Sequence, residues 1–450
     1  MNIKKVMAVQ TDVPKAEAAA SRYPNWIRSD IPEDALERLN DLGALEANPF
    51  DPVNEMDRFA IVTELLDQWL QLPEAQLDRE SRTIHRDYSR ETIVFPDAVK
   101  QSVRKSLEKT LSKEVLVGAG SSGQVGRIHV DTSPMKRSHL SMSHRPEVYK
   151  HGFTSPREVL IQIAMANTVA NVPEITAAGS LKKKGPMVTT MQAVHGWDVI
   201  DLSVLLYNAM LDGKIDEETY NRVAGMMIYD VMLALRVLNS QAIAHKDVNP
   251  NNIRFGYIGD PQSGSRILHA WLLDFGLAEP KVEGAVSYGI GTPEWMAPEA
   301  LRAATKVILD QNPGFMVVQD FYNRVSASHE APTIKVDSFG LGITLSYFMG
   351  ISAPPDLNEV GSGLPPAHQW AYRTVQACCN AEYFLFNPHH VSFEPDNVKS
   401  LIEGLMEKDP KKRLTPNAAL SHPFVEKYRP KSQSDRQELA NILEEALKEA

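Results

Sequence analysis

The chain is 450 residues long, with 43% hydrophobic and 23% charged residues, a composition typical of a globular protein with two or three domains or one large two-lobed domain. Its net charge of −10 disfavours a general role on nucleic acid, and no apolar run approaches the roughly 20 residues of a membrane span. The two cysteines, Cys378 and Cys379, are adjacent, which excludes a disulfide framework. We therefore expect the cytoplasm or another reducing compartment, and delivery into a host cell as an effector is left open.

Residues 1–112 are predicted to form a charged, mainly helical region. Two stretches, residues 59–72 and 96–111, carry apolar side chains at the three-to-four-residue spacing of a helix face. No cluster of catalytic residue types accompanies them. The region is therefore expected to be a helical accessory that packs on the rest of the chain, or a site for a regulatory partner.

A glycine-rich stretch flanked by β-forming residues begins at residue 115 and carries the pattern G-x-G-x-x-G-x-V. The motif residues are Gly118, Gly120, Gly123 and Val125, preceded by Val117. Glycines let a hairpin lie close over phosphate groups, whose oxygens then meet backbone N–H groups. Residues 124–130 are typical of a returning strand rather than a helix, which argues against a dinucleotide-binding βαβ unit.

The next segment alternates strand-like and helix-like stretches. Residues 147–150 favour a strand that ends in Lys150. Residues 155–158 form a capping box with proline at the first helical position, and the apolar run 159–169 follows it. Residues 187–199 begin with the apolar pattern of a buried strand.

A long predicted helix, residues 217–240, leads to a polar loop at residues 245–252. Asp247 and Asn252 lie on this loop, and Asp274 begins an Asp-Phe-Gly triplet further along the chain. Phosphoryl transfer needs a carboxylate that orients the attacking hydroxyl and accepts its proton, and oxygen ligands that hold Mg²⁺ on the phosphates. Asp247 suits the first role, and Asn252 and Asp274 suit the second.

Three further motifs lie downstream. Residues 291–299 read Gly-Thr-Pro-Glu-Trp-Met-Ala-Pro-Glu, residues 337–342 read Asp-Ser-Phe-Gly-Leu-Gly, and residues 408–415 include Arg413. A single motif of this kind is a weak signal of function, but several motifs in the correct order along one chain are hard to obtain by chance. Together with the glycine motif and the polar loop, they resemble the eukaryotic-type protein kinases, with Ser/Thr-like features, over about residues 113–428.

The resemblance implies an α+β, bilobal protein kinase-like fold with a helical N-terminal extension. A small β-rich N-lobe is expected over about residues 113–195, and a larger helical C-lobe over about residues 196–428. Residues 301–336 are longer than usual between the motifs and are expected to be an insertion. Residues 429–450 are expected to be a helical tail, with an acidic amphipathic helix over residues 434–450 that docks on the fold or on a partner.

The resemblance also implies an enzyme that uses ATP with Mg²⁺ or Mn²⁺ to phosphorylate Ser or Thr hydroxyls of protein substrates. In this assignment Asp247 is the catalytic base, and Thr292 lies near it and helps to position the substrate hydroxyl. Asn252 and Asp274 are the metal ligands.

Residues that would contact the nucleotide follow from the same alignment. Lys150 would hold the α- and β-phosphates and pair with Glu158, while Lys136 and Gln162 are the alternatives to these two residues. The residues assigned to nucleotide binding are Val117, Gly118, Gly120, Gly123, Val125, Lys150, Gln192, Val194 and Asp198.

Departures from the family pattern keep two other functions open. Asn249 stands where many Ser/Thr kinases carry Lys, and this change, with the open lysine and glutamate assignments, supports a pseudokinase that binds nucleotide or acts as a scaffold. Small-molecule kinases also use His-x-Asp-x-x-x-x-Asn. The segment 291–299 and the helix that begins at Asp337 argue against that class, because they build a platform for a protein substrate.

The family pattern further predicts three structural contacts. The ring of His245 is expected to pack in the core under Phe275. Asp337 is expected to anchor the backbone of the 245–252 loop, and Arg413 to pair with Glu299.

Overall fold

The computed structural model describes residues 116–120, 123–127, 147–152, single positions between 158 and 173, 175–180, 187–194, 196–240, 243–258, 267–280, 291–311, 333–351, parts of 354–364, 366–381 and 396–447. The predicted helical extension, residues 1–112, lies outside the described residues, as does Lys136. The chain divides into two compact units. The first ends at residue 193, and the second contains residues 171–173 and the chain from residue 194 onwards.

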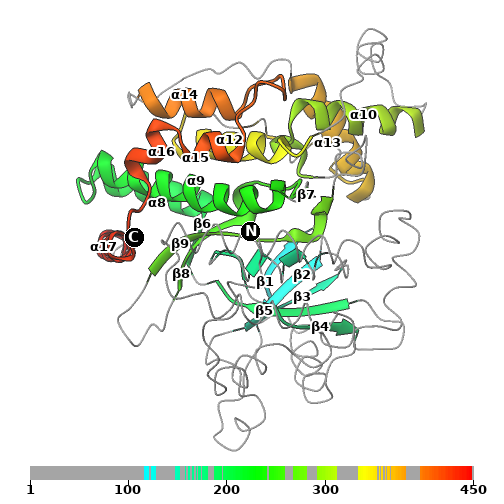
Figure 1. Cartoon of the computed structure of the whole chain (residues 1–450). Helices are drawn as coiled ribbons and strands as arrows, with labels where there is room; N and C mark the ends of the chain where they lie inside the picture. The colour runs from blue at the N-terminus through cyan, green and yellow to red at the C-terminus, as the bar shows by residue number, and fades with distance from the viewer. Residues whose placement is uncertain are drawn as a thin grey trace, which may run out of the picture. The chain divides into compact units, whose positions relative to one another are not determined.

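The first unit is built on a five-stranded sheet of order β1-β2-β3-β5-β4, in which all neighbours are antiparallel (Figure 1). Its strands are β1 (Leu116–Gly120), β2 (Gly123–Arg127), β3 (Glu147–Gly152), β4 (Ile175–Ser180) and β5 (Met187–Gln192). Gly120 lies opposite Gly123, so the strand predicted to return after the glycine motif is confirmed. Lys150 lies in the central strand β3, opposite Val125 of β2 and Thr189 of β5.

The described positions between 158 and 166 are helical. Glu158, Ile161, Gln162 and Met165 are all buried, at the spacing of one helix face. The helix predicted from the apolar run is thus present at its described positions, and residues 155–157 of the predicted capping box lie outside the described part.

The second unit is mainly helical. Its helices are α8 (Val199–Leu211), α9 (Glu217–Ser240), α10 (Pro298–Gln311), α12 (Val336–Phe348), α13 (Pro366–Ala381), α14 (Asp396–Leu405), α15 (Pro416–Leu420), α16 (Pro423–Tyr428) and α17 (Gln433–Ala446), with short 3₁₀ turns η3 (Pro250–Asn252), η4 (Phe275–Leu277) and η5 (Pro293–Trp295). The bounds of α9 are those predicted from its apolar periodicity, and α12 is buried along nearly its whole length. Among the described helices, none is long and apolar enough to cross a membrane.

Two small sheets lie beside these helices. One has the order β6-β8-β9, with strands β6 (Gly196–Asp198), β8 (Ile253–Ile258) and β9 (Ile267–Leu272), and the other pairs β7 (Ile243–Ala244) with β10 (Glu279–Pro280). The side chain of Asn171 donates to the carbonyls of Asp230 and Ala270 at 3.2 and 2.8 Å. These bonds explain why residues 171–173 belong to the second unit.

A buried ion pair joins α10 to the loop that precedes α15. Nη1 and Nη2 of Arg413 donate to the two carboxylate oxygens of Glu299 at 2.6 and 2.9 Å, and both side chains are fully buried. Nη1 also donates to the carbonyl of Lys335, and the guanidinium lies 4.9 Å from the ring centre of Phe339. The predicted pairing of Arg413 with Glu299 is therefore confirmed.

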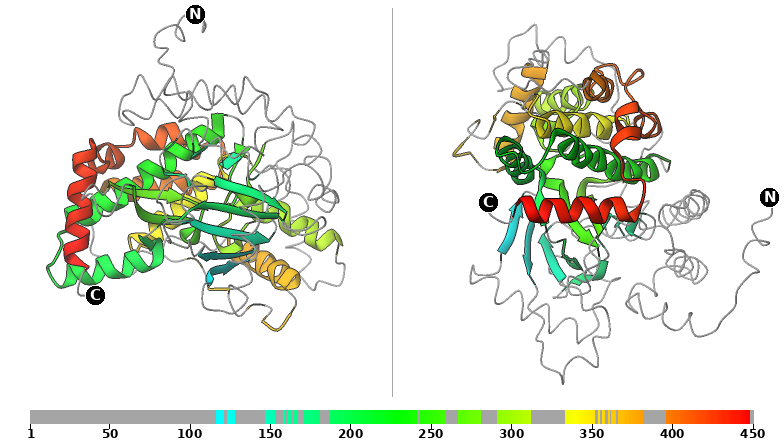
Figure 2. Two further views of the ribbon diagram at one scale, coloured as in Figure 1. Left: turned by 90° about the horizontal axis from the view of Figure 1, so that it is seen from below. Right: turned by 90° about the vertical axis from the view of Figure 1, so that its left-hand side faces the viewer.

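Two of the predicted segments differ in extent from the structure. The tail helix ends at Ala446 rather than at residue 450 of the chain, and α17 lies alongside α9 and β9 (Figures 1 and 2). Residues 301–311, at the start of the expected insertion, continue α10, and residues 312–332 lie outside the described part.

Candidate active site

Asp247 lies at the centre of a hydrogen-bond network in the second unit. Its Oδ1 accepts from the backbone N–H and from the hydroxyl of Thr292, both at 2.9 Å. Nδ2 of Asn249 donates to the same oxygen at 3.0 Å, and Nδ2 of Asn252 donates to Oδ2 at 2.9 Å. The carboxylate is therefore held in one orientation by four donors, which come from the loop itself and from a segment about 45 residues away.

Asn249 bridges Asp247 and Thr292. The residue is 1% exposed, and its Nδ2 also contacts the Asp247 carbonyl at 3.1 Å and the Thr292 hydroxyl at 3.3 Å. Its Oδ1 accepts from the N–H of Asn251 at 2.9 Å and so caps η3. The sequence indicated the loss of a positive charge at this position but not the bridge. The available signal was the tendency of Asn to bond backbone two residues ahead.

Asp337 on α12 anchors the backbone of the loop, as predicted. Its two carboxylate oxygens accept from the N–H groups of His245 and Lys246, both at 2.7 Å. Lys246 has a φ of 68°, an uncommon conformation for a residue with a side chain, and the bond from its N–H helps to hold it there. Burial raises the pKa of the Asp337 carboxyl, and the charge and N–H groups of the two loop residues offset only part of that rise.

His245 has a structural position under the loop. Its ring is fully buried and lies edge-on to Phe275, with ring centres 5.0 Å apart, so the predicted packing is confirmed. Nε2 lies 3.1 Å from the carbonyl of Leu273, which can only accept, and Nδ1 lies 3.4 Å from the N–H of Asp247. Nε2 therefore acts as the donor in this contact, and both nitrogens face protein groups.

Asn252 and Asp274 lie at the end of the β8–β9 hairpin. The N–H of Leu273 donates to the Asn252 carbonyl at 2.8 Å, which brings the backbone of Asn252 beside the residue that precedes Asp274. Nδ2 of Asn252 faces Asp247, so the amide oxygen lies on the opposite edge of the amide. Asp274 has a φ of 59°, and its Oδ1 accepts from the N–H of Gly276. Amide and carboxylate oxygens are ligands that suit Mg²⁺, so this donor set fits a hard divalent cation.

Two glycines let neighbouring segments lie directly against the loop. A Cβ atom at Gly340 would lie 2.5 Å from the carbonyl oxygen of Val248, and one at Gly291 would lie 2.7 Å from that of Lys246. Both distances are too short for a real side chain. The loop is therefore enclosed by α12 on one side and by the start of the 291–299 segment on the other.

Lys150 and Glu158 form a buried ion pair in the first unit. Nζ of Lys150 lies 2.7 Å from Oε1 of Glu158, and the two side chains are 5% and 3% exposed. Nε2 of Gln162, the alternative to Glu158, instead lies 3.8 Å from the sulfur of Met191. Lys136 lies outside the described residues. Glu158 thus has both the partner that the alignment gave it and a place in the buried helix face.

The other candidates for nucleotide contact lie on strands and a turn. Val117, Gly118 and Gly120 lie in β1, and Gly123 and Val125 lie in β2. Gln192 ends β5 and Val194 follows it, in the second unit. Asp198 caps α8, because its Oδ1 accepts from the N–H of Asp201 at 2.7 Å. Its contact with a ribose stays a prediction.

Comparison with known families agrees with this arrangement. A model of the protein kinase domain matches residues 111–425, most of the chain. The chain belongs to the protein kinase family. The anchored loop and the Arg413–Glu299 pair are thus features of a kinase domain, and α17 lies beyond the matched residues.

Among known proteins, this kinase domain is similar to the probable serine/threonine-protein kinase fhkA of Dictyostelium discoideum. The two are 29% identical over 227 residues, which cover 49% of this chain and 35% of the relative. The chain thus spans about a third of the length of that curated protein.

Proposed function

We propose that this member of the protein kinase family is an active enzyme that transfers the γ-phosphoryl group of ATP to serine or threonine hydroxyls of protein substrates. The observation that carries the proposal is the fixed carboxylate of Asp247. Oδ1 receives three of its four hydrogen bonds and Oδ2 receives one. Oδ2 therefore keeps more capacity to accept a bond from an incoming hydroxyl.

In this mechanism Asp247 orients the hydroxyl and takes its proton. The hydroxyl oxygen forms a bond to the γ-phosphorus, the bond from that phosphorus to the bridging oxygen of ADP breaks, and the proton passes to the carboxylate. Asn249 and Thr292 hold Asp247 by bonds to its other oxygen. They keep the base in place while its charge changes.

The nucleotide and a divalent cation fit the donors that the chain supplies. Mg²⁺ or Mn²⁺ would neutralise charge on the phosphates, and Asn252 and Asp274 are the residues proposed to hold it. Lys150 is proposed to contact the α- and β-phosphates. The ammonium group of Lys150 donates a hydrogen bond to Glu158, and this bond fixes its position.

Two observations favour a protein substrate with a Ser or Thr acceptor. The hydroxyl of Thr292, at the start of the 291–299 segment, bonds the proposed base directly. The relative from Dictyostelium carries the name of a probable serine/threonine-protein kinase. A regulatory partner, bound through residues 1–112 or the C-terminal helix, is a further part of the proposal.

A pseudokinase is the second candidate, and Asn249 is the observation that favours it. A neutral amide in place of a lysine leaves the transferring phosphate with one fewer cation, and its Nδ2 already faces Asp247 and Thr292. Such a site could bind nucleotide and still transfer phosphate slowly or not at all.

Labelled ATP with Mg²⁺ or Mn²⁺ tests these two functions. The purified protein should phosphorylate itself or a generic basic protein on serine or threonine, and Asp247→Ala should reduce the rate by about 10²–10⁴-fold. Asp212→Ala is the matched control, because this carboxylate is 63% exposed at the end of α8 and should leave the rate unchanged.

Each result decides between the candidates. Nucleotide binding without transfer would favour the pseudokinase. Transfer only to a small alcohol or sugar would favour a small-molecule kinase. An unchanged rate in Asp247→Ala would show that the base has been assigned wrongly.

A further inference from the structure

Side chains of helix α13 donate hydrogen bonds to residues on both sides of Thr292 in the sequence. Nε1 of Trp370 donates to the carbonyl of Gly291 at 2.9 Å, one residue before Thr292. Nε of Arg373 donates to Oε1 of Glu294 at 2.9 Å, two residues after it, and Nη2 contacts the same oxygen. Trp370 and Arg373 are three residues apart and so lie on the same face of the helix. Thr292 is thus bracketed by two polar contacts from one rigid element.

The contact between Arg373 and Glu294 is largely buried. The Glu294 side chain is 7% exposed and that of Arg373 is 26% exposed. Oε2 of Glu294 is buried and has no hydrogen-bond partner among the described residues. The charge of this carboxylate is therefore compensated mainly through Oε1 and Arg373, so loss of the guanidinium would leave a buried charge without its partner.

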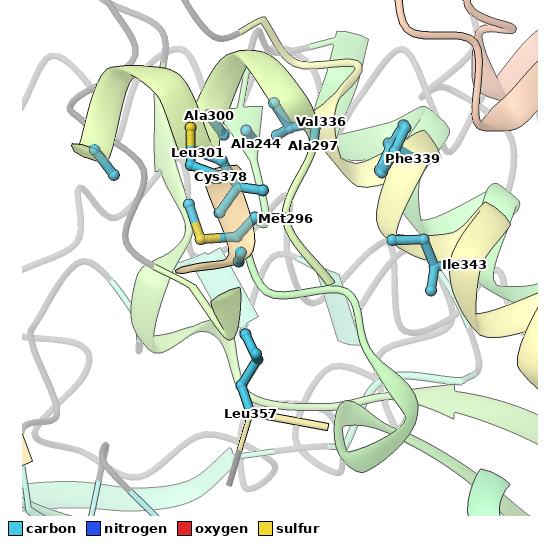
Figure 3. Packing of buried hydrophobic residues seen from close by; sticks show 12 residues of the cluster. Ala244, Met296, Ala297, Ala300, Leu301, Val336, Phe339, Ile343, Leu357 and Cys378 are labelled. Carbon is cyan, nitrogen blue, oxygen red and sulfur yellow. The ribbon is translucent and has the colours of Figure 1, made fainter. Parts of the chain in front are cut away.

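Apolar packing joins the same elements beneath the turn η5. Met296 and Ala297 follow η5 and belong to one buried cluster with Ala377 and Cys378 of α13, which also includes residues of α10 and α12 (Figure 3). Trp370 packs against the edge of this cluster. Helix α13 is therefore fixed by close packing. Its polar side chains have little freedom to follow a shift of the 291–299 segment.

The 291–299 segment is also closely packed on its other side, against the 245–252 loop. Gly291 lies so close to the carbonyl of Lys246 that even a Cβ atom would collide with it. One residue later, the N–H and the hydroxyl of Thr292 both reach Oδ1 of Asp247 at 2.9 Å. Residues 291–292 are thus held between the catalytic loop and α13.

We propose that Trp370 and Arg373 are positioning residues that hold Thr292 against Asp247 and thereby set the orientation of the base. The inference rests on the proposed kinase activity, and it assigns to α13 a part in catalysis without contact to the reacting atoms. Two hydrogen bonds from one residue to a single oxygen need a narrow range of geometry. A displacement of about 1 Å can cost a reaction about a hundredfold in rate.

The test compares four variants with the wild-type protein. Arg373→Met removes the ion pair, Trp370→Phe removes only the indole N–H, and the double variant Glu294→Gln with Arg373→Met removes both charges. Gln376→Ala is the control, since it is an exposed residue on the same helix. Two quantities are measured: kcat and KM for ATP and a protein substrate, and the hydrogen exchange of the Thr292 amide, which needs no activity.

Arg373→Met should lower kcat by about 10- to 100-fold and leave KM for ATP within about twofold. Exchange at the Thr292 amide should be about tenfold faster, because its bond to Asp247 opens more often. Trp370→Phe should show smaller changes in the same direction, the double variant should recover part of the loss, and Gln376→Ala should resemble the wild type.

The outcomes separate this inference from the proposed function. Wild-type protein that does not transfer phosphate contradicts the proposed function, while the exchange measurement still tests whether α13 holds Thr292. Wild-type transfer with an unchanged kcat or unchanged exchange in Arg373→Met overturns the inference alone. If Arg373→Met does not fold, Trp370→Phe and the double variant decide by the same two readouts.

Discussion

Arg436 on α17 and Asp230 on α9 form a buried two-point ion pair. Nη1 and Nη2 of the arginine donate to the two carboxylate oxygens at 2.9 and 2.5 Å, and both side chains are 2% exposed. Nη1 also donates to the carbonyl of Leu268, and the N–H of Ala270 donates to Asp230. Because the family match ends at residue 425, this pair makes a helix beyond the kinase domain part of the same packed unit.

Arg436→Met should lower the free energy of unfolding by about 3–5 kcal/mol, because the carboxylate of Asp230 would stay buried without its main partner. Arg222→Met is the matched control. Arg222 also joins α9 to α17, but its partner Glu438 is 60% exposed, so that loss should stay below about 1 kcal/mol. Urea unfolding at equilibrium measures both, as a shift of the midpoint with an unchanged slope. Equal losses in the two variants would mean that α17 is only loosely attached.

His269 lies beside the same ion pair, with its Nδ1 3.4 Å from Oδ2 of Asp230, and it predicts a dependence of stability on pH. Burial lowers the pKa of His269, and the charge of Arg436 adds to this, although Asp230 opposes both. The folded state therefore binds this proton less readily than the unfolded chain, whose histidine has a pKa of about 6.5. Stability should be fully present above that pH and should fall as the pH drops through the window below it, by up to about 1.4 kcal/mol for each unit of depression.

Asp230 contributes in a lower pH window. Burial alone would raise its pKa, but the charges and bonds of Arg436 and His269 hold it well below its usual range. Its contribution is therefore present above about pH 3.9 and is lost only at more acidic pH. Unfolding at about pH 7.5 and 5.5 thus avoids the window of Asp230, and the comparison with His269→Gln isolates the contribution of this histidine. His269→Gln should show a smaller difference between these two pH values than the wild type, and an equal difference would contradict the assignment.

The anchor of the 245–252 loop gives a third prediction. In Asp337→Asn one backbone N–H of His245 or Lys246 would face an amide NH₂ instead of an oxygen, and the loop would shift. We expect kcat to fall by about a hundredfold with KM for ATP little changed. Ser338→Ala is the control, since this neighbouring hydroxyl is buried and has no partner among the described residues, so its loss should be nearly neutral. A kcat that falls equally in both variants would point to general damage to α12.

Local patterns in the sequence, together with the family resemblance, were enough for several elements and contacts. The apolar periodicity of residues 217–240 predicted α9 to the residue, because a long helix repeats its signal many times. The pairs His245–Phe275 and Arg413–Glu299 followed from the resemblance to the protein kinase family, whose motifs have a fixed structural context. In these cases the residue types and their order were enough to predict the helix and the partners in each contact.

Contacts between distant segments that no family motif carries could not be predicted in this way. Arg373 and Glu294 are 79 residues apart in sequence, and nothing in the neighbourhood of either one indicates the other. Arg436 lies on a charged amphipathic helix, where an arginine is usually solvated, so its burial against Asp230 depends on a partner 206 residues away. Such pairs follow from how the helices pack rather than from local propensity.

Variants can distinguish the structural role of the Lys150–Glu158 pair from its catalytic role. Glu158→Gln should lower both stability and kcat, since it leaves a buried ammonium group without its charge partner at 2.7 Å. Lys150→Met should abolish transfer and weaken ATP binding, because a methionine cannot contact phosphates. The double variant Lys150→Met with Glu158→Leu removes both buried charges and should regain stability without regaining activity.

Lys136→Met is the decisive control for these variants, because the sequence offers Lys136 as the alternative phosphate-binding lysine. It should keep the rate and the ATP affinity of the wild type. Loss of transfer in Lys136→Met together with retained transfer in Lys150→Met would reverse the assignment and leave Lys150–Glu158 as a purely structural pair. Melting temperature, nucleotide affinity and kcat, measured on the same samples, distinguish these cases, since a structural pair changes the first quantity and a phosphate contact changes the other two.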